Sequence, residues 1–156
     1  MSKAESLQDR FAPNSVCFGC GPSNPRGLHI KSVPEGDGIV ADWRPEAYHT
    51  AFAGFGSGGI ISVLLDCHGN WAASYALMIT RKLSHPPGTV TSEYTVKFLK
   101  PTAVDKLWHL TAKASRIDGD RVHVEGGLEV DGKMTAMMKG VFVAVRDGHP
   151  AFHRWQ

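Results

Sequence analysis

The residues in this sequence that could carry out chemistry are an aspartate and two glycines within one apolar stretch. Residues 54–73 read GFGSGGIISVLLDCHGNWAA, and Asp66 lies in the middle of this stretch. Burial of an ionised carboxylate without a partner is costly, so an aspartate here is either exposed or has a specific role. A carboxylate can serve as a general base or as a nucleophile.

Gly58 and Gly59 precede Asp66 and could hold a developing negative charge. The first N–H groups of a helix have no partner within the helix, and the helix dipole favours negative charge in front of them. Glycines also let a substrate carbonyl approach the backbone closely. A carboxylate and such a helix start together could supply a base or nucleophile and a site for an oxyanion. Two structural interpretations stay open: Asp66 pairs with a basic group or hydroxyl across a subunit interface, and the glycines serve close packing.

The pattern around Asp66 predicts one long helix over about residues 58–80, with Ser57 as its N-cap and RKLSHPPG after its end. Most of this helix is apolar, which predicts burial. Asn70 lies one turn beyond Asp66 and could either orient it or satisfy a neighbouring backbone group. Both belong to a strip of small and polar residues on the remaining face, formed by Ser62, Asp66, Gly69, Asn70 and Ala73.

The other segments predict strands on both sides of this helix. A first hairpin is expected from LHIKSV (28–33) and IVADWRP (39–45), and strands follow at 89–99, 106–117, 121–130 and 133–145. The expected fold class is therefore α+β, an antiparallel sheet wrapped around one long central helix. Residues 1–26 are expected to form an irregular lead-in, 27–147 the domain, and 148–156 a tail whose aromatic residues dock at a rim or act as a lid.

Length and composition exclude several classes of protein. The chain has 156 residues and a formal net charge of +2, with dispersed Lys and Arg, so we expect one domain that binds no nucleic acid. No window approaches the roughly 20 apolar residues of a membrane span, and the N-terminus lacks the apolar core of a signal peptide. A cytoplasmic protein without membrane association is expected.

The cysteines suggest a metal site only weakly. Cys17 and Cys20 form the CFGC spacing of a zinc half-site, with His29 a conceivable partner, yet no second CxxC or HxxxH follows. Buried thiols that anchor the lead-in are favoured, and no metal is expected. Cys67 and His68 are adjacent, so on a helix they point to different faces and make a poor nucleophile and base pair.

Three segments, CFGCGPSNPRGL, GSGGIISVLLD and TVTSEYTVKFLKP, together with the order of elements, resemble the hotdog-fold acyl-CoA thioesterases of the phenylacetyl-CoA thioesterase type. The likeness covers roughly residues 16–146. It implies that the Gly58 N–H polarises the thioester carbonyl, that Asp66 acts as base or nucleophile across a dimer interface, and that Thr91 places the water or the carboxylate. Ser57, Gly59 and Asn70 are then expected to bind or orient the substrate. The implied partners are an acyl-CoA substrate and a second copy, in a homodimer or homotetramer, with coenzyme A as part of the substrate and no other cofactor.

The sequence departs from this family at Ser57, where many members have histidine. Loss of the imidazole donor leaves a second function open, a non-catalytic acyl-CoA or lipid-binding hotdog module. A dehydratase or hydratase is disfavoured, because such enzymes usually pair the acidic residue with a catalytic histidine.

The acyl group and the binding of coenzyme A are less clearly indicated. Aromatic residues near the helix would suit an aryl or medium-chain acyl tail: Phe52, Phe55, Trp71 and Tyr75. Isolated basic residues could attract the phosphates of coenzyme A or be solvated surface groups: Arg81, Lys82, Lys97 and Lys100.

Overall fold

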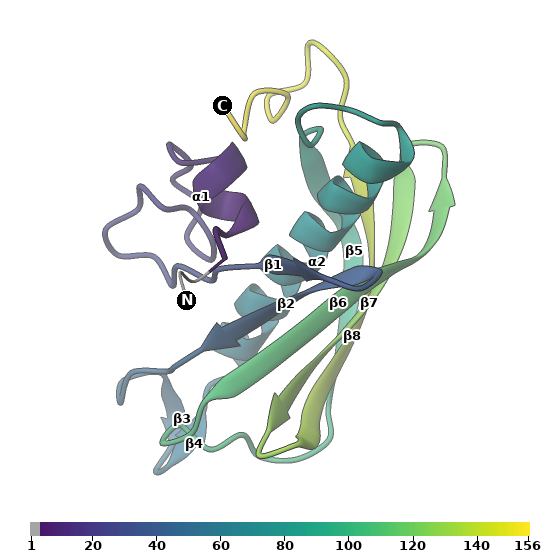
Figure 1. Ribbon diagram of the computed structural model, residues 1–156. Helices are drawn as coiled ribbons and strands as arrows, with labels where there is room; N and C mark the ends of the chain where they lie inside the picture. Colours follow the sequence, from purple (N-terminus) through teal and green to yellow (C-terminus); the bar gives the residue numbers. More distant parts are fainter. Residues whose placement is uncertain (1–3) are drawn as a thin grey trace.

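The computed structural model describes residues 4–156, in which a six-stranded antiparallel sheet curves around one long helix, α2 (Figure 1). Its strands lie in the order β1-β2-β6-β7-β8-β5, so β5 forms one edge. The bounds are β1 Val33–Glu35, β2 Gly38–Trp43, β5 Thr89–Phe98, β6 Trp108–Asp118, β7 Arg121–Val130 and β8 Lys133–Ala144. This hotdog architecture confirms the predicted fold class.

Helix α2 spans Gly58–Thr80, as the sequence pattern predicts. Ser57 occupies the N-cap position with an extended backbone, but its hydroxyl makes no capping hydrogen bond, so the expected side-chain cap is absent. At the other end Lys82 takes a left-handed conformation with φ 54°, and the Leu83 N–H bonds to the Met78 carbonyl at 2.9 Å. This left-handed closure satisfies carbonyls that the last helical turn leaves free.

The first hairpin differs from the prediction. Residues 28–32 are not a strand, and β1 begins only at Val33. His29 has φ 54°, and the N–H groups of Leu28 and Ile30 bond to carbonyls of the lead-in loop, at Phe18 and Gly19. The apolar residues of this segment are therefore buried by the loop and not by strand pairing.

Three short elements escape the sequence pattern because each has too few residues to show a recognisable hydrophobic periodicity. Helix α1 covers Leu7–Phe11, and strands β3 Thr50–Phe52 and β4 Phe55–Gly56 form a separate hairpin before α2. The Ser6 hydroxyl accepts the Asp9 N–H at 3.1 Å and caps α1. The lead-in is thus partly helical.

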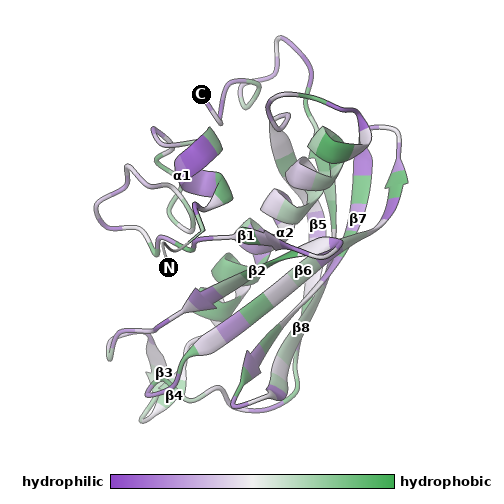
Figure 2. Cartoon of the chain, in the orientation of Figure 1, coloured by the Kyte–Doolittle hydropathy of each residue, from purple (hydrophilic) through white to green (hydrophobic). Residues whose placement is uncertain are grey.

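The core lies between α2 and the concave face of the sheet. Along β6 buried and more exposed residues alternate, which Figure 2 shows as alternating bands of hydropathy. Gly69 brings the helix close to the sheet, since a Cβ there would lie 2.5 Å from Met138 Cε and 2.9 Å from Phe142 Cζ. Gly69, one of the small residues in the predicted strip of α2, therefore faces the sheet.

Both the lead-in, through Gln8, and the C-terminal tail, through Trp155, dock at α2. Gln8 Nε2 donates to Ser32 Oγ at 2.9 Å, and Ser32 Oγ is 2.8 Å from Nδ1 of the fully buried His68. In the tail, Trp155 stacks on Trp71 with ring centroids 4.3 Å apart and donates from Nε1 to the Pro87 carbonyl at 3.0 Å. These contacts cover part of the surface of α2.

Replacement of Gly69 by valine should destabilise the fold, because the added methyl groups collide with Met138 and Phe142. We expect Gly69→Val to lower the free energy of unfolding by about 1–3 kcal/mol, the usual cost of overpacking. Urea denaturation measures this change. Gly59→Val is the matched control, since the nearest atom to a Cβ there is Ser57 Oγ at 3.5 Å. Equal stability of the two variants would contradict the close helix–sheet contact.

Candidate functional site

Asp66 is held from the edge strand. Its side chain is half-buried on α2, and Thr91 Oγ1 of β5 donates a hydrogen bond to Asp66 Oδ1 at 2.7 Å. The pairing of β5 with β8 shifts between Thr91 and Glu93, where β5 carries one extra residue. Such bulges turn a strand and redirect its side chains. The structure thus brings together two of the residues that the sequence singled out.

Several groups act on the ionisation of Asp66. Burial raises the pKa of its carboxyl above the ordinary value, and the negative charge of Cys17 raises the pKa further. The Thr91 hydrogen bond and the positive charge of Arg154 lower the pKa, but do not cancel the effect of burial. Asp66 is therefore a stronger base than an exposed aspartate.

The start of α2 offers unused donors. Within residues 4–156 no acceptor bonds to the N–H of Gly58 or Gly59, whereas the Ile61 N–H already bonds to the Ser57 carbonyl at 3.1 Å. The Ser57 N–H bonds to the His49 carbonyl at 2.9 Å, which fixes the turn that leads into the helix. Gly59 is exposed and Gly58 half-buried. The helix start can therefore accept an oxyanion.

A cavity of about 360 Å³ opens beside Gly58. Its walls are largely apolar and include Phe52, Phe55, Ile61, Phe98 and Leu99. Phe98 closes one side of the helix start, since a Cβ at Gly58 would lie 3.3 Å from its ring. The cavity can accept an apolar group whose polar end lies at the Gly58 N–H.

Two of the four expected aromatic residues do not line this cavity. Trp71 is fully buried under Trp155, and Tyr75 faces a different hollow beside Phe11. The sequence could not exclude them, because the docking partners in the lead-in and the tail are distant along the chain.

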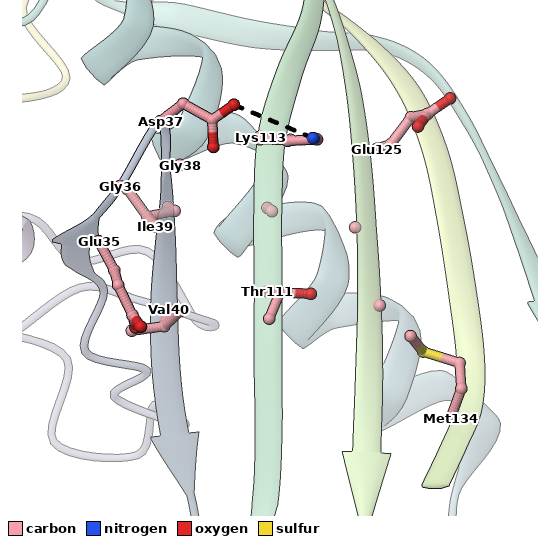
Figure 3. A pocket seen from close by; sticks show the side chains of 13 residues that line it. Glu35, Gly36, Asp37, Gly38, Ile39, Val40, Thr111, Lys113, Glu125 and Met134 are labelled. Carbon is pink, nitrogen blue, oxygen red and sulfur yellow. Dashed lines mark ion pairs between the residues drawn. The ribbon is translucent and has the colours of Figure 1, made fainter. Parts of the chain in front are cut away.

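A second hollow, of about 510 Å³, lies on the outer face of the sheet (Figure 3). Its charged groups are exposed, and Lys113 Nζ lies 3.9 Å from Asp37 Oδ2. None of the predicted site residues lines it, and α2 lies behind the strands in this view. Solvated charges of this kind do not gain the reactivity that burial gives Asp66.

The side chain of Asn70 hydrogen-bonds to Thr89 and not to Asp66. It is buried, its Nδ2 donates to the Thr89 carbonyl at 3.4 Å, and its Oδ1 accepts the Thr89 hydroxyl. Arg154 of the tail also donates to the Thr89 carbonyl, at 2.7 Å. Asn70 and Arg154 therefore fix the beginning of β5, two residues before Thr91.

Sequence reasoning missed Arg154 and the position of Cys67. The Cys67 sulfur lies 3.7 Å from that of Cys17, and both lie within 4.8 Å of the Cys20 sulfur. Hydrogen bonds from the Cys20 and Cys67 thiols lower the pKa of Cys17, and the Cys17 sulfur in turn raises the pKa of Cys20 to about 12. The sequence shows that Cys67 directly follows Asp66. Its contact with Cys17 and Cys20 becomes visible only in the structure, where the lead-in docks against α2.

The helix itself limits what one chain can do. Gly58 and Asp66 are eight positions apart, which at about 1.5 Å per residue separates their backbones by about 12 Å along α2. A nucleophile and an oxyanion donor that act on one carbonyl each lie about 3 Å from the atoms they serve. The two groups of one chain cannot reach the same carbonyl group.

Replacement of Asp66 by asparagine should stabilise the protein at neutral pH. Because the pKa of Asp66 is raised on folding, its ionised form destabilises the folded state, and this cost disappears as the pH falls through the raised pKa and below the ordinary value of 3.8. We expect Asp66→Asn to raise the free energy of unfolding near neutral pH, by an amount that shrinks in acid. Denaturant titrations at several pH values measure it.

Asp120→Asn provides the contrast for that measurement. Hydrogen bonds from Arg81 and Arg146 lower the pKa of Asp120, so its replacement should not stabilise the protein at neutral pH. A loss of stability in Asp66→Asn at neutral pH would contradict the assigned environment of the carboxyl.

Comparison with solved structures relates this fold to known proteins. A thioesterase superfamily protein from Shewanella loihica is 29% identical over 80% of this chain and 98% of its own, with a TM-score of 0.65. The E. coli PaaI protein from the phenylacetic acid degradation operon is 17% identical over 76% of this chain and 81% of its own, with a TM-score of 0.64. A Streptococcus mutans protein solved bound to acetyl CoA is 14% identical over 74% of this chain and 88% of its own, with a TM-score of 0.62.

Comparisons by sequence give no such relationship, since no family model matches the chain and no curated protein matches it. In the part of the chain that the structure describes, no helix combines the length and apolar character of a membrane span. The fold and its central helix agree with the similarity to the Shewanella protein, and the chain has the hotdog fold that thioesterase superfamily proteins share.

Proposed function

We propose that this protein hydrolyses an acyl-CoA thioester to the free acid and coenzyme A, with Gly58 of one protomer and Asp66 of a second acting on the same substrate. The observation that carries the proposal is the half-buried, hydrogen-bonded Asp66 on a helix whose first N–H groups are free. These are the base and the oxyanion donor that thioester hydrolysis requires.

In this mechanism Asp66 takes a proton from a water molecule, whose oxygen forms a bond to the thioester carbon. The carbonyl oxygen becomes an oxyanion and accepts the Gly58 N–H, which is aligned with the helix dipole. Collapse of the tetrahedral intermediate breaks the C–S bond, and the proton held by Asp66 neutralises the thiolate or the released acid. In an alternative route an Asp66 carboxylate oxygen attacks the carbon directly, and the C–S bond breaks to release coenzyme A as the thiolate. Water then hydrolyses the acyl-aspartate anhydride, which releases the acid and restores Asp66.

Thr91 and Asn70 position the base in both routes. Thr91 binds one carboxylate oxygen and leaves the other available for water, while Asn70 holds Thr89 and thereby the start of β5. Ser57 and Gly59 border the place where the carbonyl would lie. No cofactor takes part in either route.

A homodimer is supported by the edge strand as well as by the distance between Gly58 and Asp66. Strand β5 ends the sheet and exposes apolar side chains, with Tyr94 38% and Phe98 54% exposed, and Leu99, which follows the strand, is 49% exposed. An unpaired edge with exposed apolar residues is a surface suited to a second copy. Because Phe98 adjoins Gly58, a partner on this edge would come close to the helix start.

The substrate class rests on three observations. A similar structure is solved bound to acetyl CoA, and the cavity beside Gly58 has an apolar wall for an acyl group. Lys100 lines the same cavity and Lys97 is exposed close by in the chain, where either could meet a phosphate group. Arg81 is less suited, because Asp120 Oδ1 already binds its Nη2 at 2.9 Å.

A non-catalytic acyl-CoA-binding module is the second candidate, and Ser57 favours it. Where many members of the family have histidine, this chain has a hydroxyl that makes no capping hydrogen bond. The site would then keep its oxyanion donor but lose an imidazole.

Thiol release from acyl-CoAs separates the two candidates. We expect the wild-type protein to release coenzyme A, and Asp66→Asn to lower kcat by about 10²–10⁴-fold, the usual contribution of a general base. Tight binding in calorimetry without any thiol release would identify the binding module.

Thr91→Val should lower kcat less than Asp66→Asn does. It should also move the acid limb of the pH profile to higher pH, because loss of the Thr91 hydrogen bond raises the pKa of Asp66.

The role of the Gly58 N–H is tested by proline, which lacks this donor. Gly58 is the first helical residue, where proline is tolerated, and the extended backbone of Ser57 suits a following proline. Gly58→Pro should lower kcat by about 10²–10³-fold. Gly58→Ala keeps the N–H and is the matched control.

A mixed dimer tests whether two protomers share one site. When Asp66→Asn and Gly58→Pro chains are produced together, each mixed dimer contains one site with both groups intact and one site with neither. Purification through two different tags should then recover activity that both pure variants lack. No recovery in a verified mixed dimer would place both groups in one chain and contradict the proposal.

A further inference from the structure

The three cysteines of this chain form one cluster beside the candidate site. Cys17 and Cys20 come from the lead-in loop and Cys67 from α2, and their sulfurs all lie within 4.8 Å of one another, with Cys17 and Cys67 at 3.7 Å. All three are free thiols. We propose that this cluster is a thiolate site for a thiophilic divalent ion of the zinc type, in place of the metal-free anchor that the sequence favours.

The spacing of the sulfurs fits such an ion. Zinc–sulfur bonds of about 2.3 Å in tetrahedral geometry place neighbouring sulfurs about 3.8 Å apart. The 3.7 Å separation of Cys17 and Cys67 already has this value, and Cys20 is within reach of it. Thiolate ligands select soft ions over magnesium or calcium.

The surrounding residues hold the sulfurs in place. A Cβ at Gly19 would lie 2.3 Å from the Cys67 sulfur, so this position must lack a side chain for the loop to meet the helix. The Gly21 N–H bonds to the Cys17 carbonyl at 2.8 Å and closes the turn between the two loop cysteines. Trp71 Nε1 donates to the Cys20 sulfur at 3.4 Å, the kind of outer hydrogen bond that orients a metal ligand.

The fourth coordination position is left to water. Among residues 4–156 no fourth His, Cys, Asp or Glu joins the cluster. Cys20 and Cys67 are buried and Cys17 is half-buried, so an ion would enter on the Cys17 side. Binding replaces each remaining S–H bond of the cluster by a metal–sulfur bond and releases its proton to solvent.

Metal binding would have a structural consequence for the candidate site. The ion would join the lead-in to α2 at Cys67, the residue after Asp66, and would fix the helix turn that carries the carboxylate. This role is independent of the proposed hydrolysis, because its signature is the spectrum of the bound ion and not turnover.

Cobalt(II) provides the probe. The full-length protein is reduced, stripped with a chelator and titrated with Co²⁺ without oxygen. We expect a sulfur-to-cobalt charge-transfer band in the near ultraviolet that saturates at one ion per chain, and that Zn²⁺ then abolishes. Cys17→Ser and Cys67→Ser should each lose most of this band. Circular dichroism shows whether these variants are folded.

His29→Asn is the matched control, since His29 bonds to the Asn24 carbonyl outside the cluster and asparagine tolerates its left-handed backbone. This variant should keep the wild-type cobalt spectrum. The proposal would be overturned if the wild-type protein showed no such band while a thiol assay found its three cysteines reduced. Formation of a Cys17–Cys67 disulfide without any metal retention would also overturn it, and would make the cluster a redox pair.

Discussion

One hydrogen bond, from Thr91 Oγ1 to Asp66 Oδ1 over 2.7 Å, joins the edge of the sheet to the half-buried carboxylate of α2. It offsets part of the cost of removing that charge from water, and it lies next to the point where the register between β5 and β8 shifts. The start of β5 is fixed in turn by Asn70 and by Arg154 of the tail. Distant segments of the chain therefore converge on one carboxylate whose pKa stays raised.

The regular rise of α2 imposes the second constraint. It separates the free N–H groups at Gly58 from Asp66 by about 12 Å, and no side-chain rotation removes that distance. An exposed apolar edge strand that reaches Gly58 through Phe98 provides the surface on which a second copy could complete the site. The proposed dimer would therefore bring Gly58 and Asp66 of different chains to one substrate carbonyl, and it would also cover the exposed edge of β5.

The sequence predicts the elements that have a long, uniform pattern. Gly58–Thr80 is a continuous apolar helix bounded by glycines and prolines, and β5 to β8 are long strands separated by turn residues, so local preferences and burial agree. Gly58 and Asp66 could be selected because they stand out within this helical pattern, whereas Thr91 is indicated only by the resemblance to the thioesterase family. The failures occur where distant contacts decide: His29 breaks an alternating segment, Trp71 is covered by Trp155, and Cys67 meets cysteines fifty residues earlier.

A crystal structure with a thioether analogue of an acyl-CoA, which cannot be hydrolysed, would test the central claim most directly. The account predicts that the carbonyl oxygen of the acyl group lies within hydrogen-bond distance of the Gly58 N–H of one protomer. It also predicts that the Asp66 carboxylate of the other protomer lies next to the atom that replaces the scissile bond. An analogue bound away from both groups, or held by Gly58 and Asp66 of a single chain, would contradict it.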